Sequence, residues 1–394
     1  MTNPLYFSAQ DYYVDADIGK AQTLPVQAFR DPHFLDFEFR TIFSRNWLFV
    51  PQKTQPELRK DARALQEILQ IRGVQVPFSL LNQPLFLQRD WEEKLHCFPN
   101  ICTHAWFPLV HGVSRERLIT CQQHGRKFDC AGKFSGQPGF QNLPGVPRPE
   151  DHLKDLPIAE WGPFFFLSLE RPSISFEDLM KPVQASLPLI DWQEWKRMPQ
   201  VHEEREVDGN WKQHAWNYMD KFHVTFIHRA PGGLGDAVEM SSYQTELYPG
   251  SALQWVYARN PEHGWDPDLL PPRFRHPEKR VLAIWWFLFP NLTLNFYPWG
   301  LSINVYYPVP QHPEKTLFLW YHYVRDEKKY EQRNTIWLNQ QVDQEDVDAM
   351  TQVRRGIASF YAARGNFSPQ EEAGPHWFHR TLYTQLFPTD GFPA

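Results

Sequence analysis

Short apolar runs separated by Gly, Pro and Asn characterise residues 47 to about 160. The runs at 47–51, 85–88 and 94–98 are examples. Runs of this length between turn residues are typical of strands in small antiparallel sheets. The Pro-rich stretch 139–157 follows them and predicts a loop that leaves this region.

Longer apolar stretches follow after residue 160 and predict the strands of a larger sheet. These stretches are 164–169, 254–259, 282–289, 292–297, 303–309 and 317–324. Residues 34–45, 210–229 and 335–363 predict helices, the first because its apolar positions roughly follow a helical stripe. No unit of 20–50 residues repeats along the chain. The pattern therefore favours an α+β protein rather than a repeat protein.

The composition of the chain is that of a globular protein with large cores. Its 394 residues suggest two or three domains, and 42% hydrophobic with 22% charged residues do not fit a disordered chain. Aromatic residues are abundant, with 30 Phe, 16 Trp and 15 Tyr, which predicts an apolar pocket as well as a core. The formal charge of −6 argues against a nucleic-acid or anionic-membrane partner held by bulk electrostatics.

The sequence carries no pattern that directs the chain to a membrane. The N-terminal residues include acidic side chains and no apolar signal region. The most apolar stretch, 281–290, has ten residues, whereas a membrane span needs about 20. We therefore expect a cytoplasmic protein without a membrane partner.

Two Cys-His pairs form the first candidate site. Cys102-x-His104 is followed, after 16 residues, by Cys121-x-x-His124. Two short loops of this kind present two thiolates and two imidazoles. In a Rieske [2Fe–2S] centre, two Cys hold one iron and two His hold the other. A Gly-rich stretch from Gly132 to Gly139 follows and suits a covering loop.

A zinc site is the alternative for these residues. Zinc takes four tetrahedral ligands, either from the same two Cys and two His or from four Cys with Cys97 and Cys130 added. The four cysteines lie within 34 residues, which indicates metal binding rather than a disulfide scaffold. Zinc motifs usually begin with C-x-x-C rather than C-x-H. We expect Cys97 and Cys130 to be small buried hydrophobic residues rather than ligands.

The second candidate site lies in the predicted helix 210–229. Asp220 and His223 are three residues apart and would share a helix face. His223 and His228 are five apart, about 140° around an ideal helix, so both reach one metal only if the helix ends or bulges between them. Two His and one carboxylate form the facial triad of non-haem Fe(II) oxygenases. We choose Asp346 as the carboxylate, with Glu345 and Asp343 as alternatives.

At this point the sequence resembles the α (terminal oxygenase) subunits of the Rieske non-haem iron oxygenases. CTHAWFPLV and CQQHG match the cluster motifs of that family, GNWKQHAWNYMDKFHVTFIH matches its iron-binding helix, and QEDVDAMTQVRRG matches its C-terminal carboxylate helix. The segments RGNFSPQEEAGPHWFHRTL and FPNLTLNFYPWGLSINV resemble the choline monooxygenase and glycine-betaine or stachydrine demethylase branch.

The resemblance implies an α+β fold with two domains and a leading segment. A small antiparallel β Rieske domain would span 45–165. A helix-grip (START-like) catalytic domain, with an antiparallel sheet and helices, would span 166–394. Residues 1–44 would form a helical segment that packs on the catalytic domain.

The resemblance also implies roles for individual residues. Cys102 and Cys121 would bind one cluster iron and His104 and His124 the other, while His223, His228 and Asp346 would bind the mononuclear Fe(II). Asp220 would link His223 by hydrogen bonds to a cluster histidine of a neighbouring subunit. Such a carboxylate also fixes the imidazole tautomer. Asn217 matches a family position near the site.

The implied activity is oxidation of a small organic substrate with O2, by hydroxylation or oxidative demethylation. The chain has no G-x-G-x-x-G and too few cysteines for a second cluster, so a separate reductase or ferredoxin would deliver the electrons of NAD(P)H. Electron transfer between subunits favours a head-to-tail homotrimer. The alternatives are an aromatic-ring cis-dihydroxylating dioxygenase, a non-catalytic Rieske electron carrier and a zinc-binding protein.

Aromatic side chains near the second site bear on the choice of substrate. They could form a cage for a quaternary ammonium group, line a pocket for a flat arene, or simply fill the core. We lean towards a methylated amine because of the resemblance to the choline monooxygenase branch. The aromatic residues in question are Trp216, Tyr218, Trp285, Trp286, Phe287, Phe289, Phe296, Tyr297 and Trp299.

The sequence departs from the family around the cluster motifs. Ala105-Trp106 stands where the family often has Arg-Gly, and Gln122, Gln123 and Arg126 stand within its usual C-P-Y-H-G-W. Trp216 replaces a common Glu before Asn217. We expect these changes to affect the cluster's potential and the docking surface for its electron donor.

Overall fold

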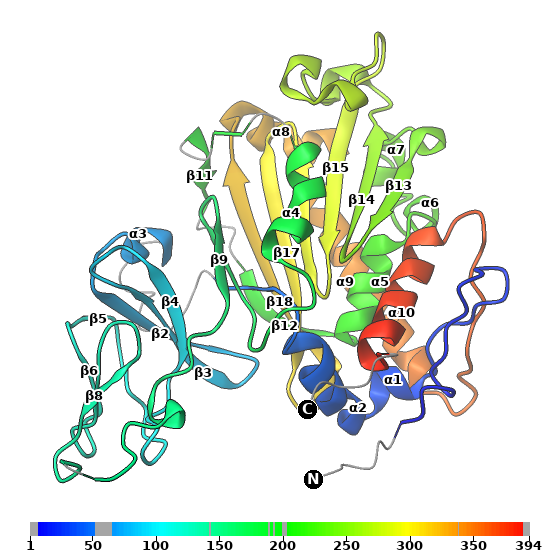
Figure 1. Ribbon diagram of the computed structural model, residues 1–394. Coiled ribbons are helices and arrows are strands. Elements are labelled where there is room, and N and C mark those ends of the chain that lie inside the picture. The colour runs from blue at the N-terminus through cyan, green and yellow to red at the C-terminus, as the bar shows by residue number, and fades with distance from the viewer. Residues whose placement is uncertain are drawn as a thin grey trace. The chain divides into compact units, whose positions relative to one another are not determined.

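The computed structural model describes residues 7–51, 65–141, 143–187, 190–191, 194–198, 203–337 and 339–388 (Figure 1). The chain forms two compact units. The larger unit comprises Met1–Asn46 and Ser173–Ala394, and the smaller unit comprises Trp47–Pro172. The N-terminal segment thus belongs to the same compact unit as the C-terminal half of the chain.

The smaller unit is built from short antiparallel strands, as the apolar runs predict. It contains three sheets with strand orders β4-β3-β2-β5, β6-β7-β8 and β1-β10-β9. The elements are β1 (Leu48–Phe49), α3 (Leu65–Leu69), β2 (Val74–Leu80), β3 (Gln83–Arg89), β4 (Leu95–Pro99), β5 (Ser114–Arg115), β6 (Ile119–Thr120), β7 (Lys127–Phe128), β8 (Phe134–Gly136), the 3-10 turn η3 (Pro149–Asp151), β9 (Ile158–Trp161) and β10 (Phe164–Leu167).

An apolar cluster in the smaller unit anchors both Cys-His pairs. Phe86 and Phe98 face one another across β3 and β4, and Phe128 on β7 joins them. Cys102 and Cys121 belong to the same buried cluster, each 1% exposed. The two thiols are therefore held by packing at the start of their loops, before any metal is considered.

The larger unit is organised around an eight-stranded antiparallel sheet. The order is β11-β18-β17-β16-β15-β14-β13, and β12 also pairs with β18. The strands are β11 (Lys196–Arg197), β12 (Glu203–Asp208), β13 (Gln244–Tyr248), β14 (Ser251–Tyr257), β15 (Val281–Leu288), β16 (Leu292–Tyr297), β17 (Gly300–Val309) and β18 (His312–Val324). Five of the six predicted strand segments of the larger unit coincide with this sheet.

The centre of this sheet is covered on both faces. All eight residues of β15 are buried. Trp286 on one face donates from Nε1 to Ser186 Oγ at the end of α4 (Phe176–Ala185), which lies in front of the strands in Figure 1. Phe287 on the opposite face packs against Phe378 of α10 (Ala373–Leu386). Since side chains alternate along a strand, two covered faces explain why the run is continuously apolar.

The helices of the larger unit complete the fold. They are α1 (Gln27–Arg30), α2 (Pro32–Glu38), the π-helix η1 (Phe39–Phe43), α4, α5 (Trp211–Met219), α6 (Val224–Ile227), α7 (Leu234–Ala237), η6 (Met240–Ser242), η7 (Pro261–His263), η8 (Pro267–Leu269), η9 (Pro272–Phe274), α8 (Glu327–Trp337), α9 (Asn339–Ile357) and α10. Within the part of the chain that the structure describes, no helix is long and apolar enough to cross a membrane.

The predicted fold class, mixed helices with antiparallel sheets in two parts, is confirmed. The bounds of three predicted helices were wrong. The helix predicted at 34–45 is α2 followed by a π-helical turn. The helix predicted at 335–363 is the pair α8 and α9, and α9 ends at Ile357 before the Ser-Phe-Tyr stretch. The helix predicted at 210–229 is interrupted, as described below.

A buried ion pair joins the N-terminal segment to the helix that leads into the second candidate site. Lys212 Nζ in α5 lies 2.7 Å from Glu38 Oε1 at the end of α2, and both side chains are fully buried. Trp211 Nε1 donates to the other carboxylate oxygen at 3.0 Å. Burial lowers the pKa of Lys212 and raises that of Glu38, and each charge counteracts the shift of the other.

Removing one partner of this pair should destabilise the larger unit strongly. Lys212→Ala leaves a buried, uncompensated carboxylate, and we expect a loss of about 3–5 kcal/mol in the free energy of unfolding, measured by urea denaturation. The exposed pair Lys196–Glu327 is the control, because Lys196→Ala should cost about 0–1 kcal/mol. A Lys212→Met, Glu38→Gln double variant should recover much of the lost stability. Equal losses for Lys212→Ala and Lys196→Ala would contradict a stabilising role for the buried ion pair.

Candidate metal centres

The segment that carries both histidines is a break between two helices. Asn210 caps α5, accepting from Lys212 N. The helix ends at Met219, and Asp220 follows in an extended conformation (φ −91°, ψ 105°). His223 and His228 then flank the single turn of α6. Asp220 and His223 therefore do not share a helix face, and the interruption required to bring the two histidines together is present.

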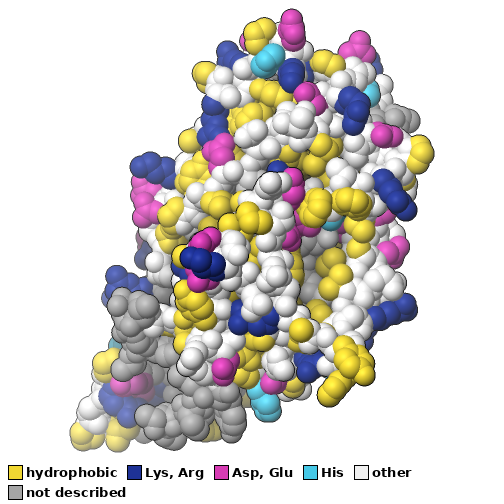
Figure 2. All heavy atoms as spheres, turned by 90° about the vertical axis from the view of Figure 1, so that its right-hand side faces the viewer, with side chains coloured by type: hydrophobic (Ala, Val, Ile, Leu, Met, Phe, Trp, Pro, Cys, Tyr) yellow, Lys and Arg dark blue, Asp and Glu magenta, His cyan; other side chains and the backbone are white. Residues whose placement is uncertain are grey.

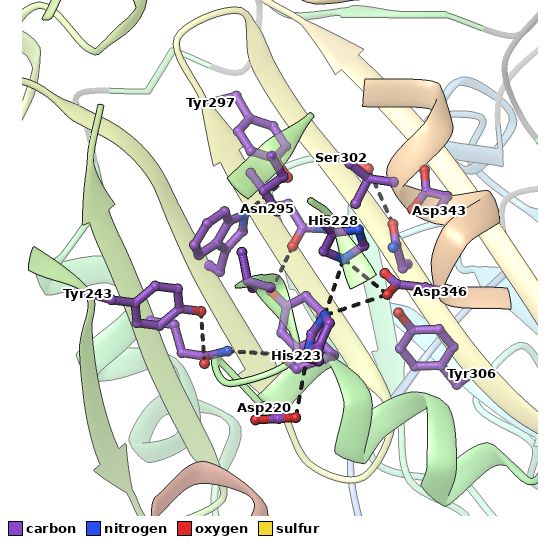
Figure 3. Close-up of a pocket in the computed structure, with 17 residues that line it drawn as sticks. Asp220, His223, His228, Tyr243, Asn295, Tyr297, Ser302, Tyr306, Asp343 and Asp346 are labelled. Carbon is purple, nitrogen blue, oxygen red and sulfur yellow. Dashed lines mark hydrogen bonds and ion pairs between the residues drawn. The ribbon is translucent and has the colours of Figure 1, made fainter. Parts of the chain in front are cut away.

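The break brings three predicted ligands into contact. His223 Nε2 and His228 Nε2 are 3.2 Å apart. Asp346 Oδ1, from α9, lies 3.2 Å from His228 Nε2 and 3.6 Å from His223 Nε2 (Figure 3). Asn217 Nδ2 donates to the same oxygen at 2.8 Å, so this predicted residue orients the carboxylate. The three side chains thus converge on one point from two separate segments of the chain.

A carboxylate behind His228 fixes which of its ring nitrogens faces the centre. Glu345 lies 2.7 Å from His228 Nδ1, whereas Asp220 lies 3.7 Å from His223 Nδ1, beyond hydrogen-bond distance. A proton on Nδ1 of His228 leaves the lone pair of its Nε2 directed at His223 and Asp346, and a proton on Nδ1 of His223 would do the same for that ring. Three electron-pair donors at this separation repel unless a cation lies between them.

The spacing of these donors fits one divalent metal ion. Nitrogen and oxygen ligands bind such ions at about 2.0–2.2 Å, which puts neighbouring ligand atoms about 3–3.5 Å apart. Two of the observed separations, both 3.2 Å, lie in this range, and the third, 3.6 Å, is slightly longer. Two histidines and one carboxylate leave further positions for other ligands.

The three acidic candidates on α9 take different places. Asp346 faces the two Nε2 atoms, Glu345 supports His228 from behind, and Asp343 lines the cavity next to the site. His214, which we did not assign to a site, bonds to Asp208 O, and burial lowers its pKa to about 4. Sequence reasoning did not foresee Glu345 as a partner of His228.

A cavity opens beside the triad and is lined by residues from the sheet. The empty space at this position is about 740 Å³ when the open solvent at its mouth is counted. Three of the nine aromatic residues that we singled out line it, namely Tyr218, Trp285 and Tyr297. Tyr243 and Tyr306 line it too, but their sequence neighbourhoods carry no signal for a pocket. Among the other six, Trp286, Phe287, Phe289, Phe296 and Trp299 are buried in the core. The alternation along β15 and β16 explains Trp286 and Phe296, which point away from the face of Trp285 and Tyr297.

The surface around the histidines is apolar. Phe222, Phe226 and Ile227 are 43%, 59% and 37% exposed, and the two phenyl rings meet edge to face. Figure 2 views the side of the molecule on which α6 and α10 lie, and hydrophobic side chains gather there between charged ones. Exposed aromatic residues next to a functional centre indicate a contact surface.

In the smaller unit, the two Cys-His loops have the same backbone plan. In each loop, the backbone N–H of the residue four positions after the cysteine donates a hydrogen bond to the carbonyl of that cysteine. Trp106 N donates to Cys102 O at 3.0 Å, and Gly125 N donates to Cys121 O at 2.9 Å. Both of these residues have positive φ, 59° for Trp106 and 66° for Gly125. Glycine is the usual residue in this conformation, so Trp106 departs from a backbone preference as well as from the family. Its side chain is 81% exposed.

The four side chains of these loops fit a two-iron cluster better than a single zinc ion. The thiols are buried, while His104 and His124 are accessible with ring centroids 4.9 Å apart. Burial raises the pKa of Cys102, and the adjacent Cys121 thiol adds to the shift, so the paired thiolates need a cation. In the described residues, no three of these four place ligand atoms within 4.8 Å of one another. A single tetrahedral ion requires that convergence, whereas two irons do not.

The other two cysteines stay apart from this centre. Cys97 is fully buried on β4, as expected for a small hydrophobic residue. Cys130 is half-buried and lies near Asp90 and Glu92 instead. The structure therefore offers no four-cysteine arrangement within the ranges it describes.

Arg126 is a buried cation beside the Cys-His loops. Its Nε donates to Gln137 at 2.7 Å and its Nη1 donates to Thr103 at 2.7 Å, while Asp151 lies at 3.2 Å. Gln137 Nε2 in turn lies 3.1 Å from His104 Nδ1. The departure from the family at this position therefore introduces a polar network that joins both loops to the turn at Asp151.

Comparisons with known proteins agree with this geometry. The family described as "Ring hydroxylating alpha subunit (catalytic domain)" matches residues 192–386, and "Rieske [2Fe-2S] domain" matches residues 62–147. Choline monooxygenase of Amaranthus tricolor is 26% identical over 92% of this chain and 78% of that protein. The carnitine monooxygenase oxygenase subunit of Escherichia coli (strain K12) is 22% identical over 94% of this chain and 96% of that protein.

A solved structure shows the same fold. The quaternary ammonium Rieske monooxygenase CntA, in complex with an inhibitor, superposes with a TM-score of 0.70 over 96% of this chain and 98% of that chain, at 19% identity. The strand and helix plan of both units is thus shared with a protein of known chemistry.

Removing the carboxylate that supports His228 should weaken metal binding without unfolding the chain. Glu345→Ala frees the Nδ1 side of His228, and we expect divalent-metal affinity to fall 10- to 100-fold, with a smaller loss for Glu345→Gln. Anaerobic titration of metal-free protein with Fe(II) or Co(II) in a calorimeter measures this. Asp348→Ala on the same helix is the control, and equal affinities for Glu345→Ala and the control would refute the role.

The turn at Asp151 should make the smaller unit sensitive to acid. Hydrogen bonds from Arg148 and then from Arg126 lower the pKa of Asp151 from its ordinary 3.8 to about 2. Because the folded pKa lies below the unfolded one, the stabilisation is complete above about pH 4 and is lost as the pH falls towards 2. The Asp151→Asn variant should unfold more easily than the unmodified chain at pH 7, and its stability should fall less between pH 4 and pH 2. Unfolding is followed by fluorescence. The control Glu116→Gln, at an exposed position, should behave as the unmodified chain.

Proposed function

We propose that this chain, which belongs to the Rieske non-haem iron oxygenases as an α subunit, hydroxylates or oxidatively demethylates a small methylated-ammonium compound. The observation that carries the proposal is the convergence of His223, His228 and Asp346 beside an aromatic cavity. Family membership establishes an oxygenase with a Rieske [2Fe–2S] cluster and a mononuclear iron.

We assign the ligands as the sequence predicts. His223, His228 and Asp346 hold the mononuclear Fe(II), and Cys102, His104, Cys121 and His124 hold the cluster. When bound, the iron activates O2 and the cluster supplies the electrons. Asn217 keeps Asp346 in place, and Glu345 keeps the proton of His228 on Nδ1.

The relatives support the substrate class. Choline monooxygenase and carnitine monooxygenase are named for compounds that carry a trimethylammonium group. In this chain, Tyr243 stacks against Trp285, with centroids 5.7 Å apart, and Tyr297 meets Trp285 edge to face. Aromatic faces attract quaternary ammonium groups through their negative quadrupole. A cavity with these walls next to the iron ligands suits oxidation of a carbon attached to such a nitrogen.

The proposal includes partners outside the chain. Hydroxylation of one C–H bond uses one oxygen atom of O2, reduces the other to water, and consumes two electrons and two protons. A separate reductase or ferredoxin brings these electrons from NAD(P)H. Asp220 carries a hydrogen-bond link from His223 towards a cluster histidine of the next subunit in a homotrimer. The apolar surface at Phe222 and Phe226 supports a subunit contact there. We place the protein in the cytoplasm.

Metal content and the Asp220→Ala variant test this function together. Anaerobically purified protein should contain about three irons per chain, two in the cluster and one at the triad. Asp220→Ala should keep its iron but lose 10- to 100-fold in product-coupled oxygen uptake, because the link from His223 is removed. The neighbouring Lys221→Ala, which breaks only the ion pair with Glu371, is the control. Zinc in place of iron, or normal turnover in Asp220→Ala, would count against the proposal.

A further inference from the structure

The two Cys-His loops place different side chains at one equivalent position. In the first loop the carbonyl of Phe107 accepts from Cys102 N at 2.8 Å. In the second loop the carbonyl of Arg126 accepts from Cys121 N at the same distance. The position thus carries a half-buried phenyl ring in one loop and a guanidinium, 2% exposed, in the other. Because Phe107 closes its loop without a charge, closing the loop does not require the cation.

The guanidinium of Arg126 reaches across to the first loop. Its Nη1 donates to Thr103 Oγ1 at 2.7 Å, and Thr103 stands between the two predicted ligands of that loop. The Thr103 hydroxyl in turn donates to the backbone carbonyl of Asp151 at 3.0 Å. The rings of Phe134 and Phe140 lie 4.8 and 5.6 Å from Cζ of Arg126. The positive charge is therefore held beside the first loop, in apolar surroundings that screen it little.

Arg126 also determines the orientation of Gln137. Its Nε can only donate, so the Gln137 atom that it meets at 2.7 Å is the acceptor Oε1. The amide nitrogen of Gln137 then faces His104 Nδ1 at 3.1 Å. Since an amide NH2 group can only donate, this nitrogen of His104 carries a lone pair and no proton. The positive end of the amide dipole is thus directed at a predicted cluster ligand.

The carboxylate of Asp151 does not cancel the effect of Arg126. Arg148 also donates to Asp151, from its backbone N at 2.8 Å and from Nε at 3.3 Å. The side chain of Arg148 is 63% exposed, so solvent and salt screen its charge. Removing Arg126 would leave the buried carboxylate without its buried cation. The surroundings of the two loops would then become more negative.

We infer that Arg126 is a positioning residue of the cluster site that raises the reduction potential of the cluster, by its own charge and through Gln137. Reduction transfers one electron from the separate electron donor and adds one negative charge to the cluster. A fixed positive charge and a donor group beside the ligands favour that product. The inference rests on the proposed function, because it concerns the cluster assigned there.

Anaerobic redox titration of the full chain, loaded with its cluster, tests the inference. Arg126→Gln should lower the equilibrium constant for reduction at least tenfold, which is about 59 mV in the midpoint potential of a one-electron couple. Arg126→Lys keeps the charge and should retain most of the potential. The titration is followed by visible absorbance and by the electron paramagnetic resonance signal of the reduced cluster, and iron analysis confirms that each variant holds its cluster.

A matched control separates the buried charge from a surface charge. Arg148→Gln removes a cation that is bonded to the same carboxylate of Asp151 but is exposed, so it should change the equilibrium constant by about twofold or less. Gln137→Glu keeps an acceptor for Arg126 Nε and neutralises the guanidinium, so it should also lower the potential. This variant decides the question if Arg126→Gln does not assemble its cluster.

The outcomes separate the inference from the proposed function. An unchanged potential in Arg126→Gln, or in Gln137→Glu where it stands in for that variant, would overturn the inference. So would a fall in Arg126→Lys or in Arg148→Gln as large as the fall in Arg126→Gln. These results leave the oxygenase function standing. Absence of a reversibly reducible two-iron cluster from the unmodified chain would overturn the proposed function itself.

Discussion

The close approach of two imidazole nitrogens is the constraint on which the candidate metal centre of the larger unit depends. His223 and His228 present their Nε2 atoms to one another at 3.2 Å, a contact that is unfavourable without a positive charge between them. Glu345 holds the ring of His228 in this orientation from behind, at 2.7 Å from its Nδ1. Helix α5 positions the segment from one end, and it is itself tied to the N-terminal part of the chain by Lys212 and Glu38. The fold thus stabilises an arrangement that only a bound cation completes.

The sequence predicted which side chains converge at the triad better than it predicted the elements that carry them. C-x-H and C-x-x-H are local patterns whose spacing places both side chains on one tight loop. The His223–His228 spacing required a break in the helix, but the apolar pattern of 210–229 continues through the break and gave no position for it. Asp346 was our first choice among three neighbouring acids, but the sequence pattern could not exclude Glu345 and Asp343, which have the same local chemistry.

The residues that line the cavity could not be predicted from the sequence pattern. Tyr243 and Tyr306 lie on or beside strands far apart in the chain, and only the sheet order brings them to one space. A run such as residues 281–288 is apolar at every position, so the pattern does not tell which side chains face a cavity and which face α4. The structure resolves this, because Trp285 and Trp286 point to opposite faces. The polar network of Arg126 was equally hidden, since its partners lie 11 and 25 residues away.

The two consecutive acids on α9 have an evolutionary consequence. Glu345 contacts Nδ1 and Asp346 contacts Nε2 of the same imidazole ring, that of His228. Consecutive side chains on a helix point about 100° apart. Inserting or deleting one residue earlier in α9 would rotate both acids away together. Lineages of this chain can therefore exchange side chains along the helix, but should keep its residue count fixed between Asn339 and Asp346.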